Sequence, residues 1–270
     1  MRRGPRQLDI RWKHSGDNAE TVDVYGRKAM DTGDTAWVLT ASALVAFMTP
    51  GLAFFYGGMV RSKHVLGMLM QNIFAMGLVS VLWAVVGFSI AFGGTNGWVG
   101  NFDFAFLTDV DFGADFLTIP PMAFVAFQMM FAVITPALIT GATADRLKFG
   151  SYALFIGIWS IVVYAPAARW VFNPAGWLFE RGALDFAGGT AIHINAGIAA
   201  LAVVAVIGNR RGHGDEPMPP HNLPLTILGT EILWFGWFGF NAGSALGANG
   251  VAAQALVNTH SRPPPRCSAG

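Results

Sequence analysis

Charged residues are scarce in this chain, and their scarcity excludes most soluble folds. Lys, Arg, Asp and Glu make up 12% of the 270 residues, whereas an average soluble domain has roughly 25%. Hydrophobic residues make up 53%, and the mean hydropathy is +0.47. A soluble protein could hardly bury this much apolar surface, so the composition predicts a membrane protein.

Two further shortages narrow the range of functions. The net charge is only +1, so the chain has no basic excess to neutralise phosphates, and we expect no nucleic-acid partner. The single cysteine, Cys267, excludes an internal disulfide and a multi-cysteine metal site. We expect no metal and no cofactor, because the sequence contains no cofactor motif.

Long intervals without a charged residue divide the chain into apolar segments. Five such intervals run from Asp34 to Arg61, from Lys63 to Asp103, from Asp115 to Asp145, from Lys148 to Arg169, and from Asp185 to Arg210. A sixth apolar segment, from about Asn222 to Leu246, contains Glu231 as its one charged residue. Each can hold a spanning helix of about 20 residues, and the runs are too continuously apolar for barrel strands. We predict an all-α transmembrane bundle with six spans at about 36–60, 65–93, 121–144, 150–172, 189–208 and 222–246.

The basic residues predict the orientation of these spans. Arg61 with Lys63, Arg146 with Lys148, and Arg210 with Arg211 lie in three connections on one side, which the positive-inside rule makes cytoplasmic. The other side carries most of the acids and an expected belt of tryptophans: Asp103, Asp109, Asp111, Asp115, Glu180 and Asp185, with Trp37, Trp98, Trp170 and Trp177. We expect a multi-pass protein of the plasma (inner) membrane, with the start of the first span outside.

The two ends of the sequence differ from the middle. Residues 1–30 are polar, carry seven basic residues and lack apolar periodicity, so we expect a disordered extension or a natural start at Met30. A seventh apolar segment begins near Val251 and gives way at Thr259 to a tail with three prolines. We therefore divide the chain into an extension (1–30), a truncated transmembrane domain (31–258) and an aberrant tail (259–270).

One histidine, His193, falls inside a predicted span. An ionisable group at membrane depth is costly and usually lines a polar path, although it can also bond a backbone carbonyl between helices. On a helix it shares a face with Ala196, Gly197 and Ala200, and such small residues let a neighbouring helix approach closely. We expect His193 to face packed protein or a narrow lumen, where imidazole can bond small polar solutes or relay protons.

Several other side chains invite a functional and a structural interpretation. Asp185 can cap the following helix or attract a cation. Phe127 and Phe131 share a helix face, as do Phe240 and Ser244; aromatic rings can bind cations or form a hydrophobic gate, and they can also simply pack. Glu231 is either a functional acid or a buried, protonated, hydrogen-bonded group.

These residues together resemble the Amt/Mep/Rh ammonium transporter family, in its bacterial or archaeal style. The main signature is Asp185-Phe-Ala-Gly-Gly-Thr-Ala-Ile-His-Ile-Asn-Ala-Gly197. Four shorter motifs follow the family's order and spacing: Pro50-Gly-Leu-Ala-Phe-Phe-Tyr-Gly-Gly58, Phe127-Gln-Met-Met-Phe131, His221-Asn-Leu-Pro224 and Gly236-Trp-Phe-Gly-Phe-Asn-Ala-Gly-Ser244. The resemblance covers residues 31–258.

The resemblance implies roles for individual residues. An outer ammonium-recruitment site would consist of Phe127, Phe131, Phe172 and Ser244, although the family often has Trp where this chain has Phe172. Phe131 and Phe240 would form a stacked gate. Asp185 would assist recruitment and deprotonation, and His193 would be the first of two pore histidines.

The resemblance also implies an assembly. The family forms homotrimers of subunits with eleven spans, in which spans 1–5 and 6–10 are an inverted repeat. This chain would supply the first repeat half and one further helix, without the second pore histidine. A PII-type signalling protein would dock on the cytoplasmic loops.

Two other function classes remain open at this point. A non-transporting membrane sensor or regulatory fragment would have the same spans. An intramembrane enzyme using His193 and Asp185 is the weaker alternative, because no nucleophile lies beside His193 and no second metal ligand follows at helical spacing. We therefore expect a transporter rather than an enzyme.

Overall fold

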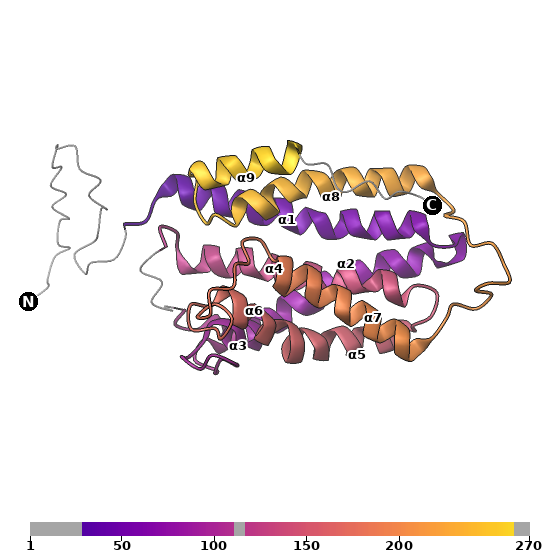
Figure 1. The fold of residues 1–270 in the computed structure, drawn as a ribbon, viewed down its shortest axis with the longest axis horizontal. Coiled ribbons are helices and arrows are strands. Elements are labelled where there is room, and N and C mark those ends of the chain that lie inside the picture. Colours follow the sequence, from indigo (N-terminus) through magenta and orange to yellow (C-terminus); the bar gives the residue numbers. More distant parts are fainter. Residues whose placement is uncertain (1–28, 111–116, 262–270) are drawn as a thin grey trace, which may run out of the picture.

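The fold is an elongated bundle of helices. The computed structural model describes residues 29–110 and 117–261. Within these ranges the chain forms helices, turns and loops, and it contains no strand. The long helices run back and forth along one common direction (Figure 1). The predicted all-α fold is confirmed.

Six helical segments of the described chain are long and apolar enough to cross a membrane. They are Thr32–Met59 (α1), Ser62–Phe92, Pro121–Thr143 (α4), Phe149–Phe172, Gly189–Ile207 and Leu223–Gly243 (α8). They agree with the predicted spans in number and order. The first begins at Thr32 rather than at about residue 36 because Asp31 caps it, accepting a 2.8 Å hydrogen bond from the Asp34 amide.

Three of these segments contain a turn of π-helix, which the sequence analysis did not predict. The second segment consists of η1 (Ser62–His64), α2 (Val65–Leu82), the π turn η2 (Trp83–Gly87) and α3 (Phe88–Phe92). The fourth consists of α5 (Phe149–Trp159), the π turn η4 (Ser160–Tyr164) and α6 (Ala165–Phe172). The fifth consists of the π turn η5 (Gly189–Ile194) and α7 (Asn195–Ile207). Pro166 explains the turn η4, since proline has no N–H to donate and its ring crowds the preceding turn. A short 3₁₀ turn, η3 (Ala105–Leu107), lies between α3 and α4.

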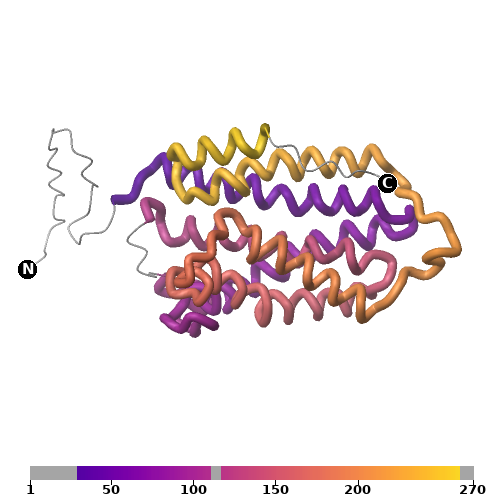
Figure 2. The backbone as a smooth tube through the Cα atoms, in the orientation of Figure 1, coloured from indigo at the N-terminus to yellow at the C-terminus, as the bar shows by residue number. Residues whose placement is uncertain are grey.

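Glycines bring α1 and α8 into close contact. A side chain at Gly229 would collide with the backbone of Phe55, and one at Gly236 would collide with Met48. Small residues at such positions let two helix backbones pack tightly in a bundle. The two helices lie side by side along most of their length (Figure 2).

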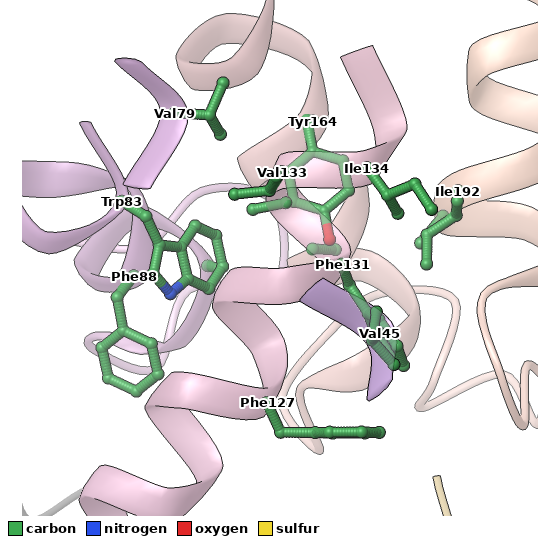
Figure 3. Packing of buried hydrophobic residues seen from close by; sticks show 14 of the residues in the cluster. Val45, Val79, Trp83, Phe88, Phe127, Phe131, Val133, Ile134, Tyr164 and Ile192 are labelled. Carbon is green, nitrogen blue, oxygen red and sulfur yellow. The ribbon is translucent and has the colours of Figure 1, made fainter. Parts of the chain in front are cut away.

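The core is centred on α4. Phe127, Phe131 and Val133 of this helix are at most 1% exposed, and so are Tyr164 from η4 and Ile192 from η5. Figure 3 shows these side chains together with Trp83 and Phe88 from the second segment. Every long segment therefore packs, directly or through one neighbour, on the helix that carries the predicted Phe127–Phe131 motif.

The connections with the paired basic residues, residues 60–64, 144–148 and 208–222, lie together at one end of the bundle, which we call the basic end (Figure 1). Arg61 Nε is 3.2 Å from Asp145 Oδ2, and His221 Nδ1 is 2.9 Å from the Val60 carbonyl. Arg146 donates to the carbonyl of Gly208. The prediction that these connections share one side is thereby confirmed.

The opposite end, which we call the aromatic end, contains all four predicted belt tryptophans, three of them in one cluster. The rings of Trp98 and Trp177 stack with centroids 4.8 Å apart, and Trp170 lies edge-on to both at about 6 Å. Trp37, near the start of α1, donates through Nε1 to the Ala242 carbonyl. Of the acidic residues predicted for this side, Asp111 and Asp115 lie outside the described residues.

A last helix, α9 (Gly250–Ser261), folds back along α8 (Figure 1). It starts where the seventh apolar segment was predicted and continues two residues beyond Thr259. With 12 residues it is shorter than the roughly 20 that a membrane crossing needs. The rest of the predicted tail, including Cys267, and residues 1–28 of the predicted extension lie outside the described residues.

Candidate functional site

The acidic turn before the fifth span is a helix cap. Asp185 Oδ1 accepts a 2.7 Å hydrogen bond from the Gly188 amide, and Oδ2 accepts 2.9 Å bonds from the amides of Thr190 and Ala191. Gly188 has φ 85°, and a side chain there would collide with Ile192. The structural interpretation of Asp185 is confirmed, and its carboxylate carries negative charge at the positive end of this helix.

This cap leads directly into the π turn that carries His193. The imidazole lies nearly parallel to the ring of Trp237, with centroids 5.8 Å apart and an interplanar angle of 17°. The ring centroid of Phe240 lies 5.7 Å from that of His193. His193 is exposed apart from these contacts, and we call the part of the imidazole that they leave uncovered its open side.

Of the two predicted surroundings of His193, packed protein is contradicted by the exposure of its side chain, and a narrow lumen stays a prediction. Ala196 is buried, but a side chain at Gly197 would meet nothing within 4 Å among the described residues. No described helix packs closely against that part of the stripe. The π turn also breaks the 3.6-residue periodicity on which the expected stripe of small residues was based.

Phe131 is the centre of an aromatic cluster drawn from three segments. Its ring centroid is 4.7 Å from that of Phe127, 4.6 Å from that of Phe240 and 6.3 Å from that of Phe172. Because Phe240 also contacts His193, the rings form a continuous series from Phe127 through Phe131 and Phe240 to His193. The structure thus brings together residues that the sequence places more than a hundred positions apart.

Burial changes along this series. Phe127, Phe131 and Phe240 are at most 1% exposed, whereas Phe172 is half-buried and His193 is exposed. The tilted pair of Phe131 and Phe240, with an interplanar angle of 40°, separates Phe127 from His193. The series therefore runs from fully buried rings to an exposed imidazole.

Ser244 lies one turn beyond Phe240, at the C-cap of α8. Its hydroxyl donates a 2.8 Å hydrogen bond to the Phe240 carbonyl, and the preceding Gly243 packs against the ring of Phe127. A hydroxyl that donates its only hydrogen still has lone pairs to accept with. Ser244 can therefore accept a hydrogen bond from a small donor next to the cluster.

Glu231, whose role the sequence left open, is exposed on the surface of α8. The interpretation as a buried acid is therefore wrong for the described chain. Helical spacing places it on a different face of α8 from Trp237 and Phe240, which contact His193. It takes no part in the aromatic series.

Sequence reasoning overlooked the role of Trp237. Its stacking on His193 joins η5 to α8, and it places an aromatic wall behind the imidazole. The signal was present, because Trp237, Phe240 and Ser244 are spaced i, i+3 and i+7 and share one helix face. Among the described residues, no three His, Cys, Asp or Glu side chains are placed to hold a metal ion.

The profile described as "Ammonium Transporter Family" matches residues 36–261. The chain belongs to the Ammonium Transporter Family. It is therefore a multi-pass membrane protein, and membership in a transporter family supports the expectation that it is not an enzyme.

Individual members of the Ammonium Transporter Family match over most of this chain. It is 53% identical to the "Ammonium transporter" of Mycobacterium tuberculosis, over 85% of this chain and 54% of the relative. Among solved structures, Candida albicans Mep2 superposes with a TM-score of 0.80 at 36% identity, over 88% of this chain and 54% of that one. A "Sensor Amt Protein" superposes with a TM-score of 0.77 at 30% identity, over 84% and 58%. The chain thus spans about half the length of the relatives that it matches.

Proposed function

We propose that this chain forms part of a membrane transporter for ammonium, which recruits the ion on aromatic rings and passes ammonia along His193. The aromatic series Phe127–Phe131–Phe240–His193 carries the proposal, because its buried rings lie between the half-buried Phe172, which packs near Phe131, and the exposed imidazole. Membership in the Ammonium Transporter Family supports the same substrate.

Recruitment uses two properties of ammonium. It is a cation, so the faces of Phe127, Phe131 and Phe172 attract it. It is also a hydrogen-bond donor, so the free lone pairs of Ser244 favour it over potassium, which cannot donate. Asp185 adds negative charge nearby and helps the ion to lose its proton.

Passage depends on desolvation. Moving an unpaired charge between the buried rings of Phe131 and Phe240 is costly, and splitting the ion into ammonia and a proton relieves this cost. His193 then offers a hydrogen-bonding partner beyond the gate, and an imidazole can relay the proton. The open side of His193 fits one wall of a pore that lies between two repeat halves.

We also propose the setting in which this transporter works. It is a homotrimer in the plasma (inner) membrane, with the aromatic end and the start of α1 outside. The basic end, where Arg61, Arg146 and Arg210 gather, then faces the cytoplasm, in accordance with the positive-inside rule. A PII-type protein would dock on this end.

The test is uptake of labelled methylammonium by cells that lack their own ammonium transporters. One arm expresses this chain alone, and the other expresses it continued by the C-terminal part of the Mycobacterium tuberculosis relative, which the chain does not cover. We expect saturable uptake in the continued protein, competed by ammonium and not by potassium. Absence of uptake in a continued protein that inserts and is stable would contradict the proposal and would favour a sensor or regulatory role.

A further inference from the structure

Arg169 is a fully buried arginine at the aromatic end, on α6. Its guanidinium donates only to backbone carbonyls. Nε donates to Asn96, Nη1 donates to Ala91 at 3.3 Å and to Gly93 at 2.7 Å, and Nη2 donates to Gly94 at 3.0 Å. Among the described residues, no carboxylate lies within ion-pair distance of it; the ion pairs there are at Asp145, at the basic end.

These carbonyls belong to the end of α3 and to the turn that follows. The last carbonyls of a helix have no partner within the helix, and they form its negative pole. A guanidinium that bonds several of them is stabilised without an acid, because the helix end supplies both acceptors and partial negative charge. Arg169 therefore binds the last part of α6 to the end of α3.

Neighbouring residues strengthen the same connection. Asn173 Nδ2 donates to the carbonyls of Ala91 and Phe92, at 3.3 and 3.4 Å. Trp170 Nε1 donates to the Trp98 carbonyl at 2.8 Å. The last turn of α6 is thus attached through three side chains to one short stretch of backbone, residues 91–98.

Phe172 lies within that attached turn. It follows Arg169 by three residues and is the only ring that α6 contributes to the cluster around Phe131, at 6.3 Å. It is half-buried, so the packing around it constrains its position less than it constrains the fully buried Phe127. The position of its ring therefore depends on how firmly the last turn of α6 is held.

We propose that Arg169 is a positioning residue for ammonium recruitment, which holds Phe172 against Phe131 by fixing the end of α6 to the end of α3. The proposal rests on the proposed function, in which Phe172 is part of the recruitment site. Lysine cannot replace this arginine. The planar guanidinium donates to four carbonyls in different directions, whereas a single ammonium group has only three N–H donors on one atom.

The first experiment measures the position of Phe172 without transport. The whole chain is purified with 4-fluorophenylalanine incorporated at position 172, and its ¹⁹F NMR spectrum is compared with that of Arg169→Lys. We expect a shifted or broadened signal in Arg169→Lys, a smaller change in Asn173→Ala, and no change in Arg181→Lys. Arg181 is the matched control: it is an exposed arginine at the same end that bonds the Trp177 carbonyl. An unchanged spectrum in Arg169→Lys would overturn the inference.

The second experiment uses methylammonium uptake by the continued protein described above. We expect Arg169→Lys to raise KM by about 3- to 10-fold, with Vmax per folded protein kept, because only a cation–π contact is weakened. If Arg169 acts through Phe172, the double variant with Phe172→Ala has the same KM as Phe172→Ala alone. Additive effects, or a loss of Vmax alone, would overturn the inference. Absence of uptake in every variant would instead contradict the proposed function, and the NMR result would still decide this inference.

Discussion

The two ends of the bundle stabilise buried charge in different ways. At the aromatic end, the Arg169 guanidinium is surrounded by backbone carbonyls and is fully buried. At the basic end, the Asp145 carboxylate is also buried, but its partners Arg61 and His64 are side chains that reach water. Backbone carbonyls fix a geometry, whereas partly exposed side chains can rearrange.

Arg146, at the basic end, also differs from Arg169, because other charged side chains surround it. Burial lowers the pKa of Arg146, and nearby Arg210 lowers it further, while Asp145 raises it. Arg146 and Arg210 lie close enough to repel each other, so this end concentrates positive charge. The difference teaches that the aromatic end holds its buried charge in a fixed geometry, whereas the basic end has charged side chains that water can reach.

The largest expected effect comes from the aromatic end. In the continued protein, His193→Asp and Asp185→Ala should each reduce methylammonium uptake to the level of cells without a transporter. The first change removes the imidazole beyond the gate, and the second removes the acceptor of three backbone amides. His213→Ala, at an exposed histidine of the basic end, is the control and should transport normally. Normal uptake in both test variants would remove these residues from the site.

An intermediate effect is expected at the basic end, and it concerns stability rather than transport. Asp145→Ala leaves Arg61 without its carboxylate, so the free energy of unfolding should fall by about 1.5–3 kcal/mol, the range for hydrogen bonds to charged groups. Denaturant unfolding of the purified chain measures it, with Lys63→Ala, at an exposed lysine of the same connection, as the control. A large increase in KM for Asp145→Ala in the continued protein would show that the two ends do not differ in this way.

The smallest expected effect is a change in KM caused by a substitution of Phe172 at the aromatic end. Trp binds cations better than Phe, so Phe172→Trp should lower KM for methylammonium by about 2- to 5-fold. The half-buried position leaves the larger ring room on its exposed side. The same substitution combined with Arg169→Lys should lose most of this gain. A gain retained in full would mean that the ring does not depend on the attachment of α6.

Much of the fold could be predicted because its signals are local. Gaps between charged residues located six spans, and the acidic turn at Asp185 located the start of the fifth. The i, i+4 spacing of Phe127 and Phe131 placed both rings on one face, as the structure has them. The roles of Phe172, Ser244 and Phe240 came from the family resemblance, and they stay predictions.

The features that escaped prediction depend on contacts between distant residues. Arg169 bonds carbonyls 73 to 78 positions away, and any residue can supply such an acceptor, so no pattern in the sequence marks it. The π turns shift the helical phase without a change in composition, and only Pro166 gives a reason for one of them. The stacking of Trp237 on His193 joins two helices whose relative rotation the sequence does not specify.

The π turn at Gly189–Ile194 has a consequence for comparing family members by sequence. A π turn holds about one residue more than an α turn, so it acts as a one-residue insertion that the helix absorbs without a loop. Removing one residue there would rotate all of α7 by about 100° relative to Asp185. Two relatives that differ by such a residue would align without difficulty on either side of it, yet would present different faces of α7 to the helices around it.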